Sequence, residues 1–182
     1  MIANRTRRAS VAAVAAVAAM VAAGFSLPAR AGQAGDIPAF VRAQHQELLS
    51  QLSALTQRPA PVGVEAGKLL GMVSPQIRRH EDVLLPVLAV LPMMAGSSAS
   101  DMGWALSLID RVRSQQPLNY REEQKIDSQV GALAAAARQA GDSEALAVGA
   151  RVADSLAEDD EVIQPTVLLV GQHLRPKPRV GM

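Results

Sequence analysis

The sequence predicts an all-α protein, folded as an antiparallel four-helix bundle with an extra short helix between its two hairpins. The chain of 182 residues is 49% hydrophobic, rich in Ala and Leu, and has no alternating strand pattern. In four long segments, apolar residues recur at steps of three and four, as on the buried face of a helix. Two sequence elements recur 78 and 79 positions later, which favours one helical hairpin used twice.

Residues 1–31 have the three parts of a secretory signal peptide. Three arginines between positions 5 and 8 form a positive start, residues 11–25 are apolar and uncharged, and residues 29–31 give the small-x-small pattern that signal peptidase accepts. The apolar run is shorter than the ~20 residues that span a bilayer. We therefore expect an exported protein, periplasmic or secreted, that begins near Gly32 and keeps no stable membrane anchor.

Composition excludes several functional classes. Without Cys, the chain can form no disulfide framework, thiolate metal site or Cys nucleophile. Four of the 18 basic residues and none of the 17 acidic ones lie in residues 1–31, so the remaining chain has 14 bases against 17 acids and a net charge of −3. This balance argues against a nucleic-acid partner.

The first hairpin is predicted from its breakers. A helix over about 37–57 follows an Asp N-cap and an early Pro. The Pro-rich residues 58–61 end this helix, because Pro cannot continue a helix and restricts the residue before it. A second helix is predicted over about 64–91, bent or interrupted near Pro75 and Pro86.

The connection to the second hairpin is predicted as a loop at 96–100 followed by the extra short helix over 101–115. Pro117 is expected to break the chain again before a third long helix over about 119–140. Gly141 closes that helix, since Gly tolerates positive φ at a helix C-terminus.

Asp142 or Ser143 is predicted to cap the last long helix, which continues towards Pro165. We expect His173 to lie beyond this helix, in solvent. The domain organisation is then a signal peptide over 1–31, a bundle over 32–174 and a basic, Pro-rich tail over 175–182.

The internal repeat aligns residues 50–55 with residues 128–133, and residues 80–86 with residues 159–165. In the second pair, His-Glu-Asp-Val-Leu-Leu-Pro aligns with Asp-Asp-Glu-Val-Ile-Gln-Pro. Ala-rich helices can match by chance, so the shared order of acidic residues, apolar residues and Pro is the stronger indication.

Each predicted inner stripe holds one polar residue of a type that binds metals: His45, His80, Glu123 and Asp159. The repeat pairs His45 with Glu123 and His80 with Asp159. A buried carboxylate must be paired, neutralised or bound to a metal. Two imidazoles and two carboxylates held by rigid helices suit a transition metal. Residues one turn away that can add ligands are Gln76, Asp127 and Ser155.

Each position also has a purely structural explanation. A single His on an apolar face is usually a satisfied core residue, and Glu123 or Asp159 can lie near a solvated helix end. The acidic run 158–161 is typical of an exposed turn. Four such residues, one per helix and paired by the repeat, favour a site.

Residues 37–169 resemble a hemerythrin-like domain, also called the HHE cation-binding family. His45 matches the His that this family has in its first helix. Glu123 with Asp127 stands where the third helix of the family has a His followed four residues later by His or Glu. The resemblance implies a four-helix bundle with bound iron or another divalent metal.

The second and fourth helices of the family have a His followed four residues later by an acid, just before an apolar element and Pro. Those places hold Gln76 with His80, and Ser155 with Asp159. The Pro-containing helix endings match, although the usual Phe before Pro is absent. Most family histidines are missing, so the resemblance implies one metal ion, a carboxylate-rich pair of ions or none.

Two functions follow. The first is an exported hemerythrin-like protein whose interior metal ion, with His45, His80, Glu123, Asp127 and Asp159 as candidate ligands, serves oxygen or metal sensing, storage or transport. The alternative is a metal-free bundle that binds a partner or a small apolar ligand, with its interior polar residues paired to one another.

The sequence gives little support to an enzyme and identifies no protein partner. It has no phosphate-binding Gly-rich loop, Gly-x-Ser-x-Gly elbow or His-Glu-x-x-His zinc motif. Peroxide or oxygen chemistry at a bound iron is the one enzymatic function that remains consistent with it.

Overall fold

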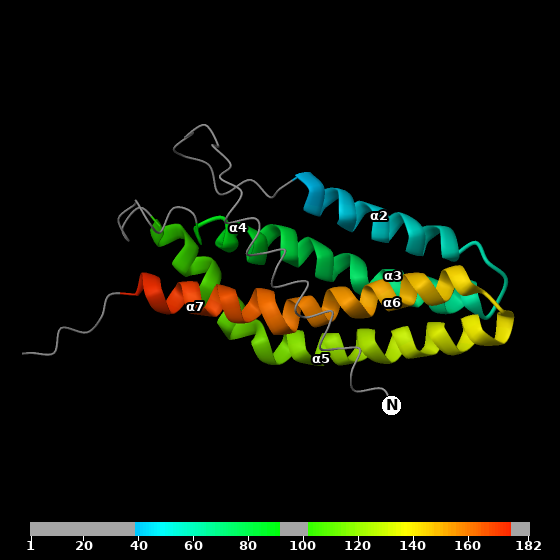
Figure 1. The fold of residues 1–182 in the computed structure, drawn as a ribbon. Coiled ribbons are helices and arrows are strands. Elements are labelled where there is room, and N and C mark those ends of the chain that lie inside the picture. Colours follow the sequence, from blue (N-terminus) through cyan, green and yellow to red (C-terminus); the bar gives the residue numbers. More distant parts are fainter. Residues whose placement is uncertain (1–38, 92–101, 176–182) are drawn as a thin grey trace, which may run out of the picture.

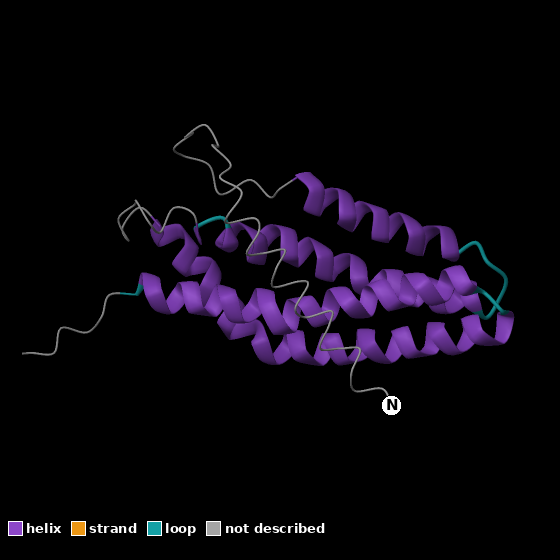
Figure 2. Cartoon of the chain, viewed as in Figure 1, coloured by secondary structure: helices purple, strands orange, loops and turns teal. Residues whose placement is uncertain are grey.

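The structure, a computed structural model, describes residues 39–91 and 102–175. These residues are helical apart from short turns and pack as a helical bundle, so the predicted all-α class is confirmed (Figures 1 and 2). The leader, the predicted loop at 96–100 and residues 176–182 of the tail lie outside the described residues.

The first hairpin consists of α2 (Ala39–Leu55) and α3 (Val62–Arg79), joined by a turn that contains the two predicted breaker prolines. Pro75 lies inside α3 and does not end it. The helix continues through a π-helical segment, η1 (His80–Leu84), into α4 (Leu85–Leu88).

The predictions of an extra short helix and of a break at Pro117 are wrong. Residues of both predicted helices form one continuous helix, α5 (Gly103–Ala140), with Pro117 inside it. The missing N–H and the clash with the preceding turn normally break a helix at Pro. Here Ile109 and Val112 are buried before Pro117 and Ile126 is buried after it, so packing holds both halves of α5 in line.

The start of the second hairpin agrees with the sequence. Gly141 has a φ of 67° and closes α5, and the Asp142 side chain caps α6 (Ser143–Glu158) by accepting a hydrogen bond of 3.0 Å from the Ala145 N–H. The end differs from the prediction. A second π-helical segment, η4 (Asp159–Ile163), continues into α7 (Gln164–Leu174), which contains Pro165 in its first turn. His173 therefore lies within a helix. Its side chain is exposed, as expected.

The two π-helical segments have the same sequence cause. The N–H of Leu85 donates to the carbonyl of His80, and the N–H of Gln164 donates to that of Asp159, five residues back in each case. The following residue is a proline, Pro86 or Pro165, whose ring would clash with the carbonyl four residues earlier. A wider turn relieves that clash, so the repeated sequence gives repeated geometry.

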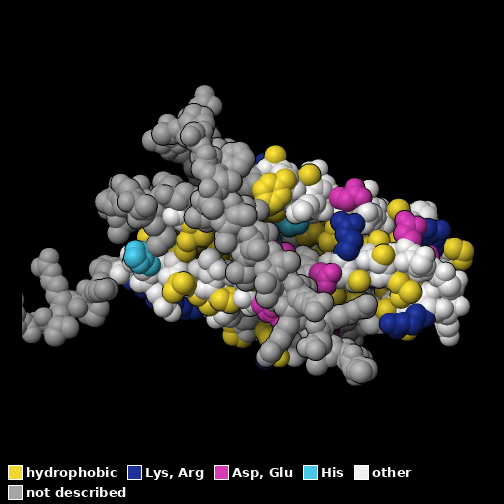
Figure 3. Space-filling view, viewed as in Figure 1, with side chains coloured by type: hydrophobic (Ala, Val, Ile, Leu, Met, Phe, Trp, Pro, Cys, Tyr) yellow, Lys and Arg dark blue, Asp and Glu magenta, His cyan; other side chains and the backbone are white. Residues whose placement is uncertain are grey.

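The elements form a closed ring of contacts in which α2 and α5 each pack against both α3 and α6. Neighbours in this ring run in opposite directions along the bundle (Figure 1). No helix in the described ranges is long and apolar enough to cross a membrane. Acidic and basic side chains are interspersed on the visible face (Figure 3).

Two apolar cores fill the bundle, one after the other along its length. The first is built from α2, α3, α6 and the C-terminal part of α5, and includes Leu52, Leu69 and Leu133. The second is built from η1, α4, α7 and the N-terminal part of α5, and includes Ile109 and Val167. The buried polar side chains lie at the junction between these cores.

Candidate functional site

A layer of six buried polar side chains separates the two apolar cores. They are Gln76, His80, Asn119, Glu123, Asp159 and Gln164. Along the first hairpin, His80 lies between Ile77 of the first core and Val83 of the second. A buried polar group needs a partner, so each of these side chains needs a hydrogen bond, an ion pair or a ligand.

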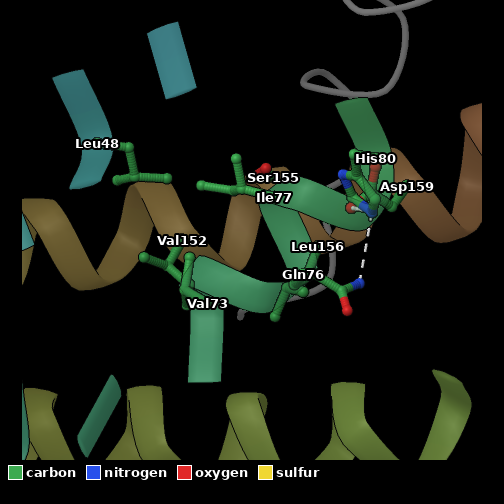
Figure 4. Close-up of a pocket in the computed structure, with 9 residues that line it drawn as sticks. All are labelled: Leu48, Val73, Gln76, Ile77, His80, Val152, Ser155, Leu156 and Asp159. Carbon is green, nitrogen blue, oxygen red and sulfur yellow. Dashed lines mark hydrogen bonds and ion pairs between the residues drawn. The ribbon is translucent and has the colours of Figure 1, made fainter. Parts of the chain in front are cut away.

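A small cavity lies on the α3 and α6 side of this layer (Figure 4). The volume that the centre of a water molecule can occupy in this cavity is about 10 Å³. This is room for one water molecule or one monatomic ion. Its polar lining consists of Gln76, His80, Ser155 and Asp159. Its apolar lining consists of Leu48, Val73, Ile77, Val152 and Leu156.

His80 and Asp159 meet at the end of this cavity, and their side chains are 6% and 3% exposed. The Nε2 atom of His80 lies 3.0 Å from Oδ2 of Asp159. The two atoms are close enough for an ion pair, but their orientation is not that of a hydrogen bond. Oδ2 of Asp159 is therefore buried without a hydrogen-bond partner among the described residues.

Gln76 is held in one orientation by Arg79. The Arg79 guanidinium donates to Oε1 of Gln76 at 3.0 Å, to Glu122 at 2.5 Å and to Asn119. The Gln76 amide nitrogen then faces Nε2 of His80 at 3.4 Å. Because an amide nitrogen only donates, Nε2 of His80 is the acceptor and its ring carries the proton on Nδ1. Nε2 of His80 and Oδ2 of Asp159 thus approach each other as two acceptors.

His45 lies outside the cavity. Its Nδ1 atom is 2.8 Å from Oε1 of Glu81, which follows His80 in η1. The side chains are 15% and 27% exposed, so the pair lies at the edge of the bundle between α2 and η1. The structure therefore pairs His45 with Glu81 rather than with another predicted ligand.

Glu123 lies on the opposite side of the layer. Gln164 donates to its Oε1 atom at 3.1 Å and to Oδ1 of Asp160 at 3.2 Å. Burial raises the pKa of Glu123 above its usual range, and the charges of Asp160 and Asp159 raise it further. An open groove of about 510 Å³, lined by residues that include Tyr120 and Pro117, reaches this carboxyl group.

The donors do not fit the two-ion centre of the hemerythrin-like family. Asp127 is exposed on α5. Within the described ranges, no three His, Asp or Glu side chains gather in a group that could hold a metal ion. The structure brings together His80 and Asp159, places Glu123 beside Asp160, and leaves His45 with Glu81.

The sequence reasoning missed the partners that organise the layer. They are Arg79, Glu81, Asn119, Asp160 and Gln164. Two signals were available, since Glu81 and Asp160 directly follow His80 and Asp159 in the repeated element. Helical periodicity does not identify Arg79 or Asn119 as partners of the layer. Asn119 stands at the predicted start of the third long helix, whereas it lies in the middle of α5.

No family model, no curated protein and no solved structure matches this chain. The resemblance to a hemerythrin-like domain therefore stays a prediction from the sequence.

Proposed function

We propose that this chain is an exported, hemerythrin-like protein that holds a divalent metal ion, iron or another, in the interior of an antiparallel four-helix bundle. The observation that carries the proposal is Oδ2 of Asp159, a buried carboxylate oxygen that has no hydrogen-bond partner in residues 39–91 and 102–175 and lies 3.0 Å from Nε2 of His80. The ion serves metal or oxygen sensing, storage or transport.

The fold supports this proposal. The closed ring of α2, α3, α5 and α6, with neighbouring helices in opposite directions, is the arrangement expected of this family. The π-helical segments coincide with the elements that resemble the family's helix endings, and π-helical turns are frequent at functional sites.

The geometry of the pair suits a cation. Two acceptors that face each other repel unless a proton or a metal ion lies between them. Two donor atoms about 2.1 Å from one ion, at right angles to each other, are about 3.0 Å apart, as His80 and Asp159 are. A neutral imidazole and a carboxylate are ligands for several divalent transition metals.

The chain's own residues have separate roles in this site. Arg79 orients the Gln76 amide, and through it sets which nitrogen of His80 is free of a proton. The apolar lining keeps bulk water away from the pair. A bound metal ion would supply the positive charge that the buried carboxylate of Asp159 lacks.

Elemental analysis tests this function on the untagged mature protein. We expect about one equivalent of a transition metal in the wild type and its loss in His80→Ala and Asp159→Ala, with unchanged helix content. His173→Ala is the matched control, because His173 is exposed in α7. A metal-free wild type, after reconstitution with Fe²⁺, Zn²⁺ and Mn²⁺, would contradict the proposal.

Two polar pairs whose members bond to each other favour a second candidate, a metal-free bundle that acts as a binding or interaction module. His45 bonds to Glu81, and Glu123 accepts a hydrogen bond from Gln164, so both side chains have protein partners. This candidate predicts that replacing both His80 and Asp159 with Leu leaves every property except stability unchanged, because apolar residues can replace a buried polar pair.

A further inference from the structure

We infer that the cavity is a single-ion site shared between the two copies of a duplicated hairpin, with His80 from one copy and Ser155 and Asp159 from the other as its donors. This inference rests on the proposed metal binding and deepens it. It departs from the two-ion centre that the family resemblance implies.

The duplication is visible in the lining of the cavity. Eight of the nine lining residues form four pairs of corresponding positions, each pair 79 residues apart in the sequence. The pairs are Val73 with Val152, Gln76 with Ser155, Ile77 with Leu156, and His80 with Asp159. Both π-helical segments also begin and end at positions 79 residues apart.

Contact between corresponding residues fixes the number of sites. Where two copies of one unit are related by a two-fold axis, a residue can contact its own counterpart only next to that axis. His80 and Asp159 are counterparts and lie 3.0 Å apart. A two-fold axis that relates the hairpins would therefore pass between them, and a site on such an axis occurs once.

The size of the cavity and its donors agree with one ion. A space of about 10 Å³ for the centre of a water-sized sphere accommodates one such ion and no second one. The donors are one imidazole, one hydroxyl and one carboxylate, with one negative charge in total. A second divalent ion would lack both space and charge, because Gln76 and Ser155 occupy places where the family has histidines.

The remaining candidate ligands are engaged elsewhere. His45 is bonded to Glu81, and Glu123 is bonded to Gln164 on the other side of the layer. The single-ion site therefore needs only His80, Asp159 and Ser155, with water completing the coordination sphere. Gln76 is not a ligand, because its Oε1 atom is bonded to Arg79. One imidazole and two oxygen donors favour a small divalent transition metal.

An exchange of the two counterparts tests this arrangement. Near a two-fold axis, the double variant His80→Asp with Asp159→His keeps the same imidazole and carboxylate on the same cavity. With Co²⁺ as the probe, titrated into the full mature protein, we expect one equivalent in the wild type. The exchanged variant should bind within about tenfold of it, whereas His80→Ala and Asp159→Ala should each weaken binding at least about 100-fold.

Ser155→Ala tests the hydroxyl donor, with Ser114→Ala as the control because Ser114 is exposed and donates to the Arg111 carbonyl. We expect about tenfold weaker Co²⁺ binding and a changed Co²⁺ absorption spectrum in Ser155→Ala alone. We expect the same variants to be folded in the absence of metal, as circular dichroism and thermal unfolding would establish.

The outcomes separate the two proposals. No Co²⁺ binding in the wild type contradicts the proposed function. Two equivalents in the wild type, or a spectrum unaffected by Ser155→Ala, contradicts the single-ion site while metal binding stands. Loss of binding in a folded exchanged variant contradicts the two-fold relation between the donors.

Discussion

Gln164, at the start of α7, donates a hydrogen bond of 3.1 Å to the carboxyl group of Glu123 in the middle of α5. The same amide contacts Asp160 at 3.2 Å, so two carboxyl groups share one donor. Two negative charges so close together are unfavourable, and Glu123 is the more buried of the two residues. The pair therefore favours a proton on Glu123.

The first prediction follows from that proton. The raised pKa of Glu123 means that the folded protein keeps the proton at pH values where the unfolded chain has lost it. The stabilisation is complete below the ordinary value of 4.5 and is lost as pH rises through the raised pKa. Glu123→Gln removes this loss, so we expect a more stable protein at neutral pH.

Thermal unfolding of metal-free protein between pH 4 and pH 8 checks this prediction. The wild type should lose stability across the raised pKa, and the Glu123→Gln variant should lose less. Asp127→Asn is the control, since it neutralises an exposed acid one turn later on the same helix. An identical pH profile in wild type and Glu123→Gln would contradict the raised pKa.

The second prediction concerns the pair His80 and Asp159 in metal-free protein. His80→Leu replaces the imidazole beside the buried Asp159 carboxylate with an apolar side chain, and a buried charge in less polar surroundings costs about 3 kcal/mol. Adding Asp159→Leu removes the orphaned charge, and the double variant should recover most of that loss. Chemical denaturation of both variants measures the difference. Equal destabilisation in the two would mean that the pair is not coupled.

The fold was predictable where a residue acts through its own backbone. Gly141 and Asp142 end one helix and begin the next because of positive φ and an N-cap, and both are local effects. Pro117 was misjudged because the packing of Ile109, Val112 and Ile126 on both sides of it outweighs the local cost of a Pro in a helix.

The candidate site was predictable in part for the same reason. The helical stripes correctly place His80, Glu123 and Asp159 in the interior, because periodicity determines which face is buried. Periodicity does not determine which helices are neighbours at a given level. For that reason it could not assign Glu81 to His45, or Gln164 to Glu123.

The third prediction is cleavage of the leader near Ala31. The apolar run is followed by the small-x-small residues 29–31 at the distance that signal peptidase requires. Intact-mass spectrometry of the exported protein should find a chain that begins near Gly32. Residues 1–31 retained on a membrane-bound form would contradict both cleavage and the proposed location.

The fourth prediction tests the apolar core. Leu52 is fully buried in α2, and Leu52→Asp places an unpaired charge among apolar side chains. We expect a loss of at least about 4 kcal/mol, enough to unfold most of the protein. Leu118→Asp is the matched control, because Leu118 is 60% exposed and should tolerate the charge. Circular dichroism and thermal unfolding measure both variants, and similar stability of the two would contradict the position of α2 in the bundle.

The fifth prediction concerns the close approach of α7 to α5. A Cβ atom at Gly171 would lie 2.5 Å from Cγ2 of Ile109, which is far inside van der Waals contact. Ile109 is completely buried and β-branched, so its methyl group cannot move aside without disturbing the second core. Gly171→Ala should therefore destabilise the protein by about 1–3 kcal/mol through overpacking, although Ala favours a helix more than Gly does.

Two further variants make this result specific to the contact. Gly149→Ala in α6 meets its nearest neighbours at 3.8 Å, an ordinary contact distance, and should stabilise the protein by up to about 1 kcal/mol. Adding Ile109→Val does not relieve the clash, because Val keeps both branches at Cβ, whereas Ile109→Ala removes the clashing methyl group. Gly171→Ala should thus cost less in an Ile109→Ala background than in the wild type, as a double-mutant cycle by chemical denaturation would measure. Additive effects of the two substitutions would mean that α7 and α5 are not in contact at this position.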